Sequence, residues 1–75
     1  MRITYDRDAN AAYIYLTDVE LEAGRTTIPA SLPPGLAGFV ALDWKDDRLV
    51  GIEVLDADTR LCPELLEQAE ETTND

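Results

Sequence analysis

The chain is short and strongly acidic, and both properties exclude whole classes of function. Its 75 residues carry 16 carboxylates against six basic side chains, for a formal net charge of -10. Nucleic acid and anionic membrane surfaces are bound mainly through lysine and arginine, so we expect neither as a partner. Histidine, the commonest acid–base group and metal ligand, is absent. We therefore expect no enzymatic activity, no bound metal and no cofactor.

The cysteine content bears on stability and on compartment. A domain of this size is marginally stable and usually needs an additional stabilising device. The single cysteine, Cys62, cannot form an intrachain disulfide, so oligomerisation is the remaining candidate. A lone thiol fits a reducing compartment, and the N-terminus lacks the apolar core of a signal peptide. No apolar run is long enough to span a membrane. These features predict a cytoplasmic protein.

Alternating polar and apolar residues predict two strands in the first 17 residues. Ile3 and Tyr5 alternate with polar residues over 2–6. In 11–17 two aliphatic side chains and two tyrosines point to opposite faces of the strand. The residues between the strands are turn formers. Segment 18–24 also alternates, and its assignment stays open between a hairpin arm and a loop.

A third strand is predicted over 25–30 by its β-branched residues. Pro29 cannot donate to a ladder, which indicates a sheet edge or a strand end. Residues 31–38 form a loop around consecutive prolines and a glycine, flanked by Leu32 and Leu36. These leucines either fold back onto the sheet, which is the default expectation, or contact a partner.

Residues 39–55 predict a β-hairpin, because two apolar runs flank the polar turn 45–48. Gly51 interrupts the second arm, so a bulky neighbour or a bulge is expected there. Residues 56–60 read as a capped turn. Pro63 then suits the first position of a helix, and apolar residues from Leu61 to Ala69 follow helical spacing.

These elements predict one α+β domain over 1–71, followed by a disordered acidic tail over 72–75. We expect an antiparallel β-meander of four or five strands, with one C-terminal α-helix packed on one face. The predicted core is Ile3, Tyr5, Ile14, Leu16, Val40, Leu42, Val50, Ile52, Val54, Leu61 and Leu65.

Two blocks of the sequence resemble a known family. The blocks are Ile3-Thr4-Tyr5-Asp6 with Asn10–Leu16, and Leu49–Ala57. They are similar to the small bacterial domain-of-unknown-function family catalogued as 2283. Asn10 stands where that family usually has aspartate, and Asp47 where its turn usually has glycine. The resemblance implies no activity and no catalytic residues. Because genes of the family often neighbour small toxin-like domains, it also implies an antitoxin or partner role.

The aromatic side of the sheet is the candidate interface. Tyr13 and Tyr15, with Phe39 on the matching face of another strand, lie opposite the face that the helix covers. One helix of about three turns covers one face only, so Leu32 and Leu36 close the second face or a partner does. We therefore expect a homodimer or a small basic protein partner at this surface.

The leading functional expectation is a non-enzymatic acidic partner or oligomerisation module, such as an antitoxin-like binder of a basic protein. The alternative is a small-ligand or divalent-cation binding domain that uses the aspartate turns. Turn formation explains those aspartates better, because the calcium-loop spacing is absent. Asp43 and Glu53 are expected to form a solvent-facing polar pair. Cys62 lies at a helix start, where a thiol pKa falls, but has no histidine to activate it.

Overall fold

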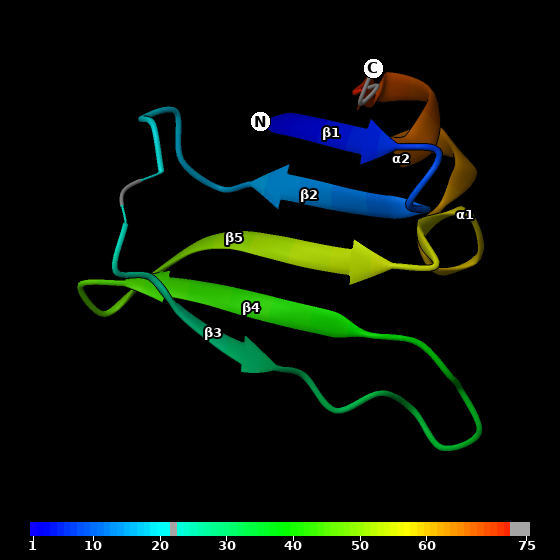
Figure 1. The fold of residues 1–75 in the computed structure, drawn as a ribbon, viewed down its shortest axis with the longest axis horizontal. Coiled ribbons are helices and arrows are strands. Elements are labelled where there is room, and N and C mark those ends of the chain that lie inside the picture. The colour runs from blue at the N-terminus through cyan, green and yellow to red at the C-terminus, as the bar shows by residue number, and fades with distance from the viewer. Residues whose placement is uncertain (22, 73–75) are drawn as a thin grey trace.

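The described part of the chain forms a six-stranded sheet with two short helices at one end (Figure 1). The structure is a computed structural model and describes residues 1–21 and 23–72. The sheet order is β3-β4-β5-β2-β1-β6, and the architecture is α+β, as predicted. The elements are β1 (Arg2–Asp6), β2 (Ala11–Tyr15), β3 (Thr26–Pro29), β4 (Val40–Lys45), β5 (Arg48–Leu55), α1 (Ala57–Arg60), α2 (Pro63–Gln68) and β6 (Glu70–Glu71).

The predicted meander order is wrong at one connection. The hairpin β1–β2 and the three-stranded unit β3–β4–β5 are each antiparallel, but β2 pairs with β5 instead of β3. The described residues on either side of position 22 lie at the end of the sheet, and β3 lies at the far edge from β1 (Figure 1). The sequence of β3 suits an edge position. The strand ends in Pro29, which has no N–H to donate to a second neighbour, and at the edge all four of its residues are exposed.

The chain end also departs from the prediction. The predicted helical pattern extends to Ala69, but α2 ends at Gln68, and β6 then pairs in parallel with β1. The sheet is therefore not purely antiparallel. A longer helix is not favoured here, because the last turn of α2 holds no basic residue to offset the helix dipole. The extended β6 is stabilised instead by an ion pair between Glu71 and Arg7. The amide of Thr72 donates to the carbonyl of Tyr5 at 2.8 Å. The rest of the predicted disordered tail, 73–75, lies outside the described residues.

Two short helices replace the single predicted one. The predicted capped turn is α1, which follows Asp56 in a left-handed conformation, with φ of 56°. Its cap comes from the β1–β2 turn: Asn10 Oδ1 accepts from the amide of Asp58 at 3.1 Å, and Asn10 Nδ2 donates to Asp58 Oδ1 at 2.8 Å. The second helix begins at Pro63, as expected. Neither helix in the described residues is long and apolar enough to cross a membrane.

The predicted hairpin 39–55 is confirmed as β4 and β5. Its turn residues Asp46 and Asp47 both have positive φ, at 50° and 64°. Two consecutive left-handed residues match the twist of a two-residue hairpin turn, and aspartate tolerates this conformation better than most side chains. The register shifts between Asp43 and Trp44, which is the irregularity expected near Gly51.

The core is smaller than predicted. Its buried apolar members are Ile3, Ala12, Ala41, Val54 and Ala57. Packed against the cluster of Ala12, Val54 and Ala57 are the half-buried Tyr5, Val40, Ile52, Leu61 and Leu66. Of the predicted core, only Ile3 and Val54 are buried, most others are half-buried, and Leu16 is exposed. The physical reason is that helices of four and six residues cover only one end of the sheet.

Candidate functional site

Strand register divides the side chains of the sheet between two faces. One cross-strand row places five aliphatic residues side by side: Ile3, Ile14, Ile52, Leu42 and Ile28. The neighbouring row, on the opposite face, contains Arg2, Tyr15, Gly51, Asp43 and Thr27. We call these the aliphatic face and the polar face. Their chemistry differs so strongly that each is considered as a separate candidate site.

A buried carboxylate lies at the centre of the polar face. Asp43 is only 5% exposed. Its Oδ2 accepts a hydrogen bond of 2.5 Å from the hydroxyl of Tyr13, and its Oδ1 accepts one of 2.6 Å from the hydroxyl of Thr27. Arg25 Nε lies 3.6 Å from Oδ2 and completes an ion pair. A buried charge is tolerated when it is paired and hydrogen-bonded in this way.

Gly51 makes the contact between Tyr13 and Asp43 possible. β5 lies between β2 and β4, so the tyrosine must cross it to reach the carboxylate. A Cβ atom on Gly51 would overlap the hydroxyl and ring atoms of Tyr13. The missing side chain is therefore the space that the aromatic ring occupies, and the expectation of a bulky neighbour at Gly51 is confirmed.

These contacts fix the ionisation states of the pair. Burial by itself raises the pKa of Asp43, but hydrogen bonds from Thr27 and Tyr13 and the charge of Arg25 favour the carboxylate more strongly. The net result is a pKa below the ordinary aspartate value. For Tyr13, burial raises the pKa of the phenol most, and the hydrogen bond and charge of Asp43 raise it further. At neutral pH a neutral phenol thus donates to an ionised carboxylate.

On the same face, aromatic contacts extend the polar network across the strands toward β1. The rings of Tyr13 and Tyr15 lie 4.8 Å apart at an angle of 57°. The guanidinium of Arg2 lies 4.2 Å from the centroid of Tyr15, a cation–π arrangement. Side chains from β1, β2, β4 and β3 are therefore linked on this face. Among the described residues, no buried side-chain nitrogen or oxygen lacks a hydrogen-bond partner.

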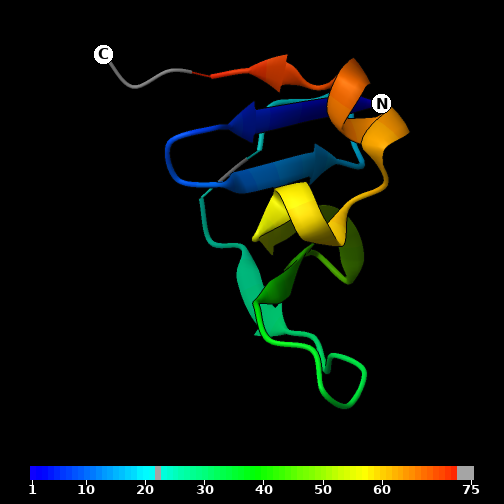
Figure 2. The same ribbon diagram turned by 90° about the vertical axis from the view of Figure 1, so that its right-hand side faces the viewer.

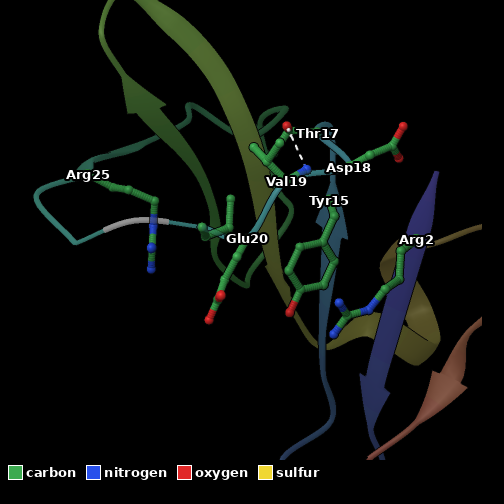
Figure 3. Close-up of a pocket in the computed structure, with 8 residues that line it drawn as sticks. Arg2, Tyr15, Thr17, Asp18, Val19, Glu20 and Arg25 are labelled. Atoms are coloured by element: carbon green, nitrogen blue, oxygen red, sulfur yellow. Dashed lines mark hydrogen bonds between the residues drawn. The ribbon is translucent and has the colours of Figure 1, made fainter.

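A hollow of about 690 Å³ adjoins this network at the start of the β2–β3 connection (Figure 3). Tyr15 and Arg2 lie on one side, and Glu20 and Arg25 lie across from them (Figure 3). Charges of both signs suit a small polar molecule. None of the described residues that line the hollow is a nucleophile hydrogen-bonded to a base, which is the arrangement that covalent catalysis requires.

The predicted interface residues fall into two separate places. Tyr13 and Tyr15 lie together on the polar face, and Phe39, half-buried, directly precedes β4. Leu32 is half-buried and Leu36 is 44% exposed. Both leucines belong to the loop between β3 and β4, which projects beyond the sheet (Figures 1 and 2). A role of these five residues in an interface stays a prediction.

The loop has its own attachment to the fold. Arg60, the last residue of α1, donates to the carbonyl of Ala37 through Nε at 3.1 Å and through a terminal nitrogen at 2.6 Å. This holds the loop near the helical end of the sheet and away from the tyrosines. The default expectation that both leucines fold back onto the sheet therefore does not describe Leu36.

The aliphatic face is covered at one end only. Ala57, Leu61 and Leu66 of the helical segment pack over the end of the sheet that holds Val54 and Ala12. Toward the opposite end, exposure rises on the same face. We define the open patch as Leu16, Ile28, Leu42, Trp44, Val50 and Ile52, of which Leu16, Ile28 and Trp44 are 39%, 48% and 38% exposed. The sequence analysis assigned most of these residues to the core, because it predicted one longer helix where the structure has two short ones.

The remaining candidates have local structural roles. Asp6 Oδ1 accepts hydrogen bonds from the amides of Asp8 and Ala9, as an Asx turn does. Within the described residues, no group of three or more histidine, cysteine, aspartate or glutamate side chains is placed to hold a metal ion. The prediction of a solvent-facing pair is wrong for Asp43, which is buried. Cys62 is exposed at the start of α2.

The geometry defines a small α+β sheet domain with a hydrogen-bonded, buried carboxylate on one face and a partly open apolar patch on the other. Residues 2–57 match the family described as Protein of unknown function (DUF2283). The chain belongs to this family, and the resemblance predicted from the sequence is confirmed. No curated protein and no solved structure matches the chain.

Proposed function

We propose that the protein is a non-enzymatic acidic module that works by associating with another protein through the aliphatic face of its sheet. The observation that carries the proposal is the incomplete cover of this face, where Ile28 and Trp44 remain exposed beside half-buried aliphatic neighbours. Soluble domains normally bury such a face against a second layer, and contiguous apolar patches on a protein surface mark interaction sites.

The polar groups support a binding role over a catalytic one. Asp43, the one buried carboxylate among the described residues, is engaged by Tyr13, Thr27 and Arg25. A general acid or base must instead reach a substrate proton. A single thiol and the absence of histidine suit a structural or binding module in a reducing compartment such as the cytoplasm.

The charge distribution favours a basic protein or a second copy of the chain as the partner. No basic residue follows Arg60, whereas five carboxylates do. Such an acidic segment steers association with a basic surface, and the apolar patch then supplies the contact area. An antitoxin-like role toward a small basic protein fits this combination.

The proposal is tested by co-expression with the product of an adjacent gene, with the acidic protein tagged. We expect co-purification of a stoichiometric partner, or self-association of the tagged protein. Either complex should be lost in Ile28→Lys and retained in Leu36→Lys, whose target side chain is similarly exposed but lies on the loop. A chain that stays monomeric and binds no partner, or a complex indifferent to Ile28→Lys, contradicts the proposal.

A further inference from the structure

The open patch leaves the aliphatic face uncovered at the end of the sheet that lies away from the helices. In the row that crosses the sheet, exposure increases from Ile3, which is 6% exposed, to Ile28, which is 48% exposed. Farther toward the uncovered end lie Leu16 and Val50, whose backbones are joined by a hydrogen bond of 3.1 Å, and Trp44, which pairs with Leu49 beyond the register shift. The patch thus spans strands β3, β4 and β5 and the end of β2, and none of the helices among the described residues lies over it.

The chain exposes more surface than a compact monomer of its mass. A monomer of 8.3 kDa should expose about 4,600 Å², whereas this chain exposes 5385 Å². The surplus includes the projecting β3–β4 loop as well as the open patch (Figure 1), and its size of about 800 Å² is comparable to the area that each partner contributes to an interface of standard size. In agreement with this, no large side chain in the described residues is completely buried.

The edges of the sheet are poor sites for association by strand addition. On β3, the amide of Ala30 donates inward to Val40, so the alternation of an antiparallel strand turns Thr27 and Pro29 outward. Pro29 has no N–H to offer a new strand. On the other edge, β6 is two residues long and consists of Glu70 and Glu71. Short, charged or proline-containing edges resist pairing, which leaves the face of the sheet as the site of contact.

Few charges border the open patch, and they are of both signs. Lys45, Asp46 and Asp47 line a hollow together with Ile28 and Trp44, whereas Arg25 and Glu20 lie by the polar face. The carboxylates of α2 and β6 lie at the helical end. A second copy can therefore approach this end without the repulsion that a net charge of -10 suggests, and each copy offers both signs of charge to the rim.

We infer that the occupant of the open patch is a second copy of this chain, packed sheet against sheet about a two-fold axis with the acidic helical ends apart. This inference rests on the proposed function and names its partner. A two-fold interface uses the same patch on both subunits, and aligned sheets pack with their inner side chains interdigitated about 10 Å apart. The dimer has the two-layer core that the isolated chain lacks.

The inference is tested on the full chain by sedimentation equilibrium at micromolar concentration. We expect twice the monomer mass of 8.3 kDa. Ile28→Lys should give the monomer mass with unchanged circular dichroism, because Ile28 is already 48% exposed on an edge strand. The matched control Leu36→Lys should remain dimeric. Trp44 is the only tryptophan, so its emission should shift to longer wavelength on dilution and in the Ile28→Lys variant.

Three outcomes overturn the inference. A wild-type chain that is monomeric, yet forms an Ile28-sensitive complex with a basic partner, refutes the second copy while leaving the proposed function standing. A monomer that binds no partner refutes both. A dimer that survives Ile28→Lys but dissociates in Tyr13→Ser with Tyr15→Ser moves the interface to the polar face.

Discussion

Substitution of Gly51 by alanine tests the central contact of the polar face. The new methyl group needs the space that the ring of Tyr13 occupies over β5, and the ring can move only by leaving Asp43. The protein then loses a hydrogen bond to a buried carboxylate, which costs about 1.5–3 kcal/mol. Replacing glycine within a strand returns about 0.5–1 kcal/mol of conformational entropy. We therefore expect Gly51→Ala to lower the free energy of unfolding by about 1–2 kcal/mol.

The assay is urea denaturation of four proteins at one concentration: wild type, Gly51→Ala, Tyr13→Ala and the double variant. In the Tyr13→Ala background no ring blocks the methyl group, so Gly51→Ala should be neutral or stabilising by up to about 1 kcal/mol. The two sites should therefore show a coupling energy of about 2 kcal/mol. Equal effects of Gly51→Ala in both backgrounds, within about 0.5 kcal/mol, would refute the contact.

Three further predictions concern the ionisation of Asp43, the ionisation of Tyr13 and the cap of α1. Because folding lowers the pKa of Asp43, its stabilising contribution is present at neutral pH and is lost as the pH falls through the folded-state pKa, so Asp43→Asn should flatten the acid side of the stability profile. Because folding raises the pKa of Tyr13, its contribution is present below the unfolded value of about 10 and is lost above it; Tyr13→Phe should lack this alkaline loss in the same titration. Asn10→Asp should cost about 1 kcal/mol in thermal unfolding, since the new carboxylate faces Asp58 and the Nδ2 donor is lost. Adding Asp58→Asn should recover most of that cost, and equal melting of the single and double variants would contradict this account.

Local patterns in the sequence predicted local structure well. The hairpin of β4 and β5 could be predicted because two apolar runs flank a polar turn. Pro29 correctly indicated a sheet edge or a strand end. Pairing between distant segments could not be predicted from the sequence. The residues of β2 do not indicate that this strand pairs with β5, and that pairing brings Tyr13 across Gly51 to Asp43. For that reason Asp43 was expected in solvent.

The sequence pattern also did not predict how much of the sheet the helices cover. The spacing of Leu61, Leu65 and Leu66 predicted an apolar helical stripe, and these leucines do lie in or beside the helices. The pattern does not show that the helix breaks into two pieces, nor that the chain then returns to the sheet as β6. The open patch follows from that break, because the short helices reach only one end of the aliphatic face.

The seam between β2 and β5 has a consequence for the order of folding. Residues paired across it are roughly 40 positions apart in the chain, so forming it requires the closure of a long loop. The hairpins on either side of the seam need only short loops and form within microseconds. We expect the C-terminal three-stranded unit to order first and the N-terminal hairpin to dock in the slow step. Conservative truncations in β1, such as Ile3→Val, should then speed unfolding with little effect on the folding rate, and a large drop in the folding rate would place that hairpin in the nucleus instead.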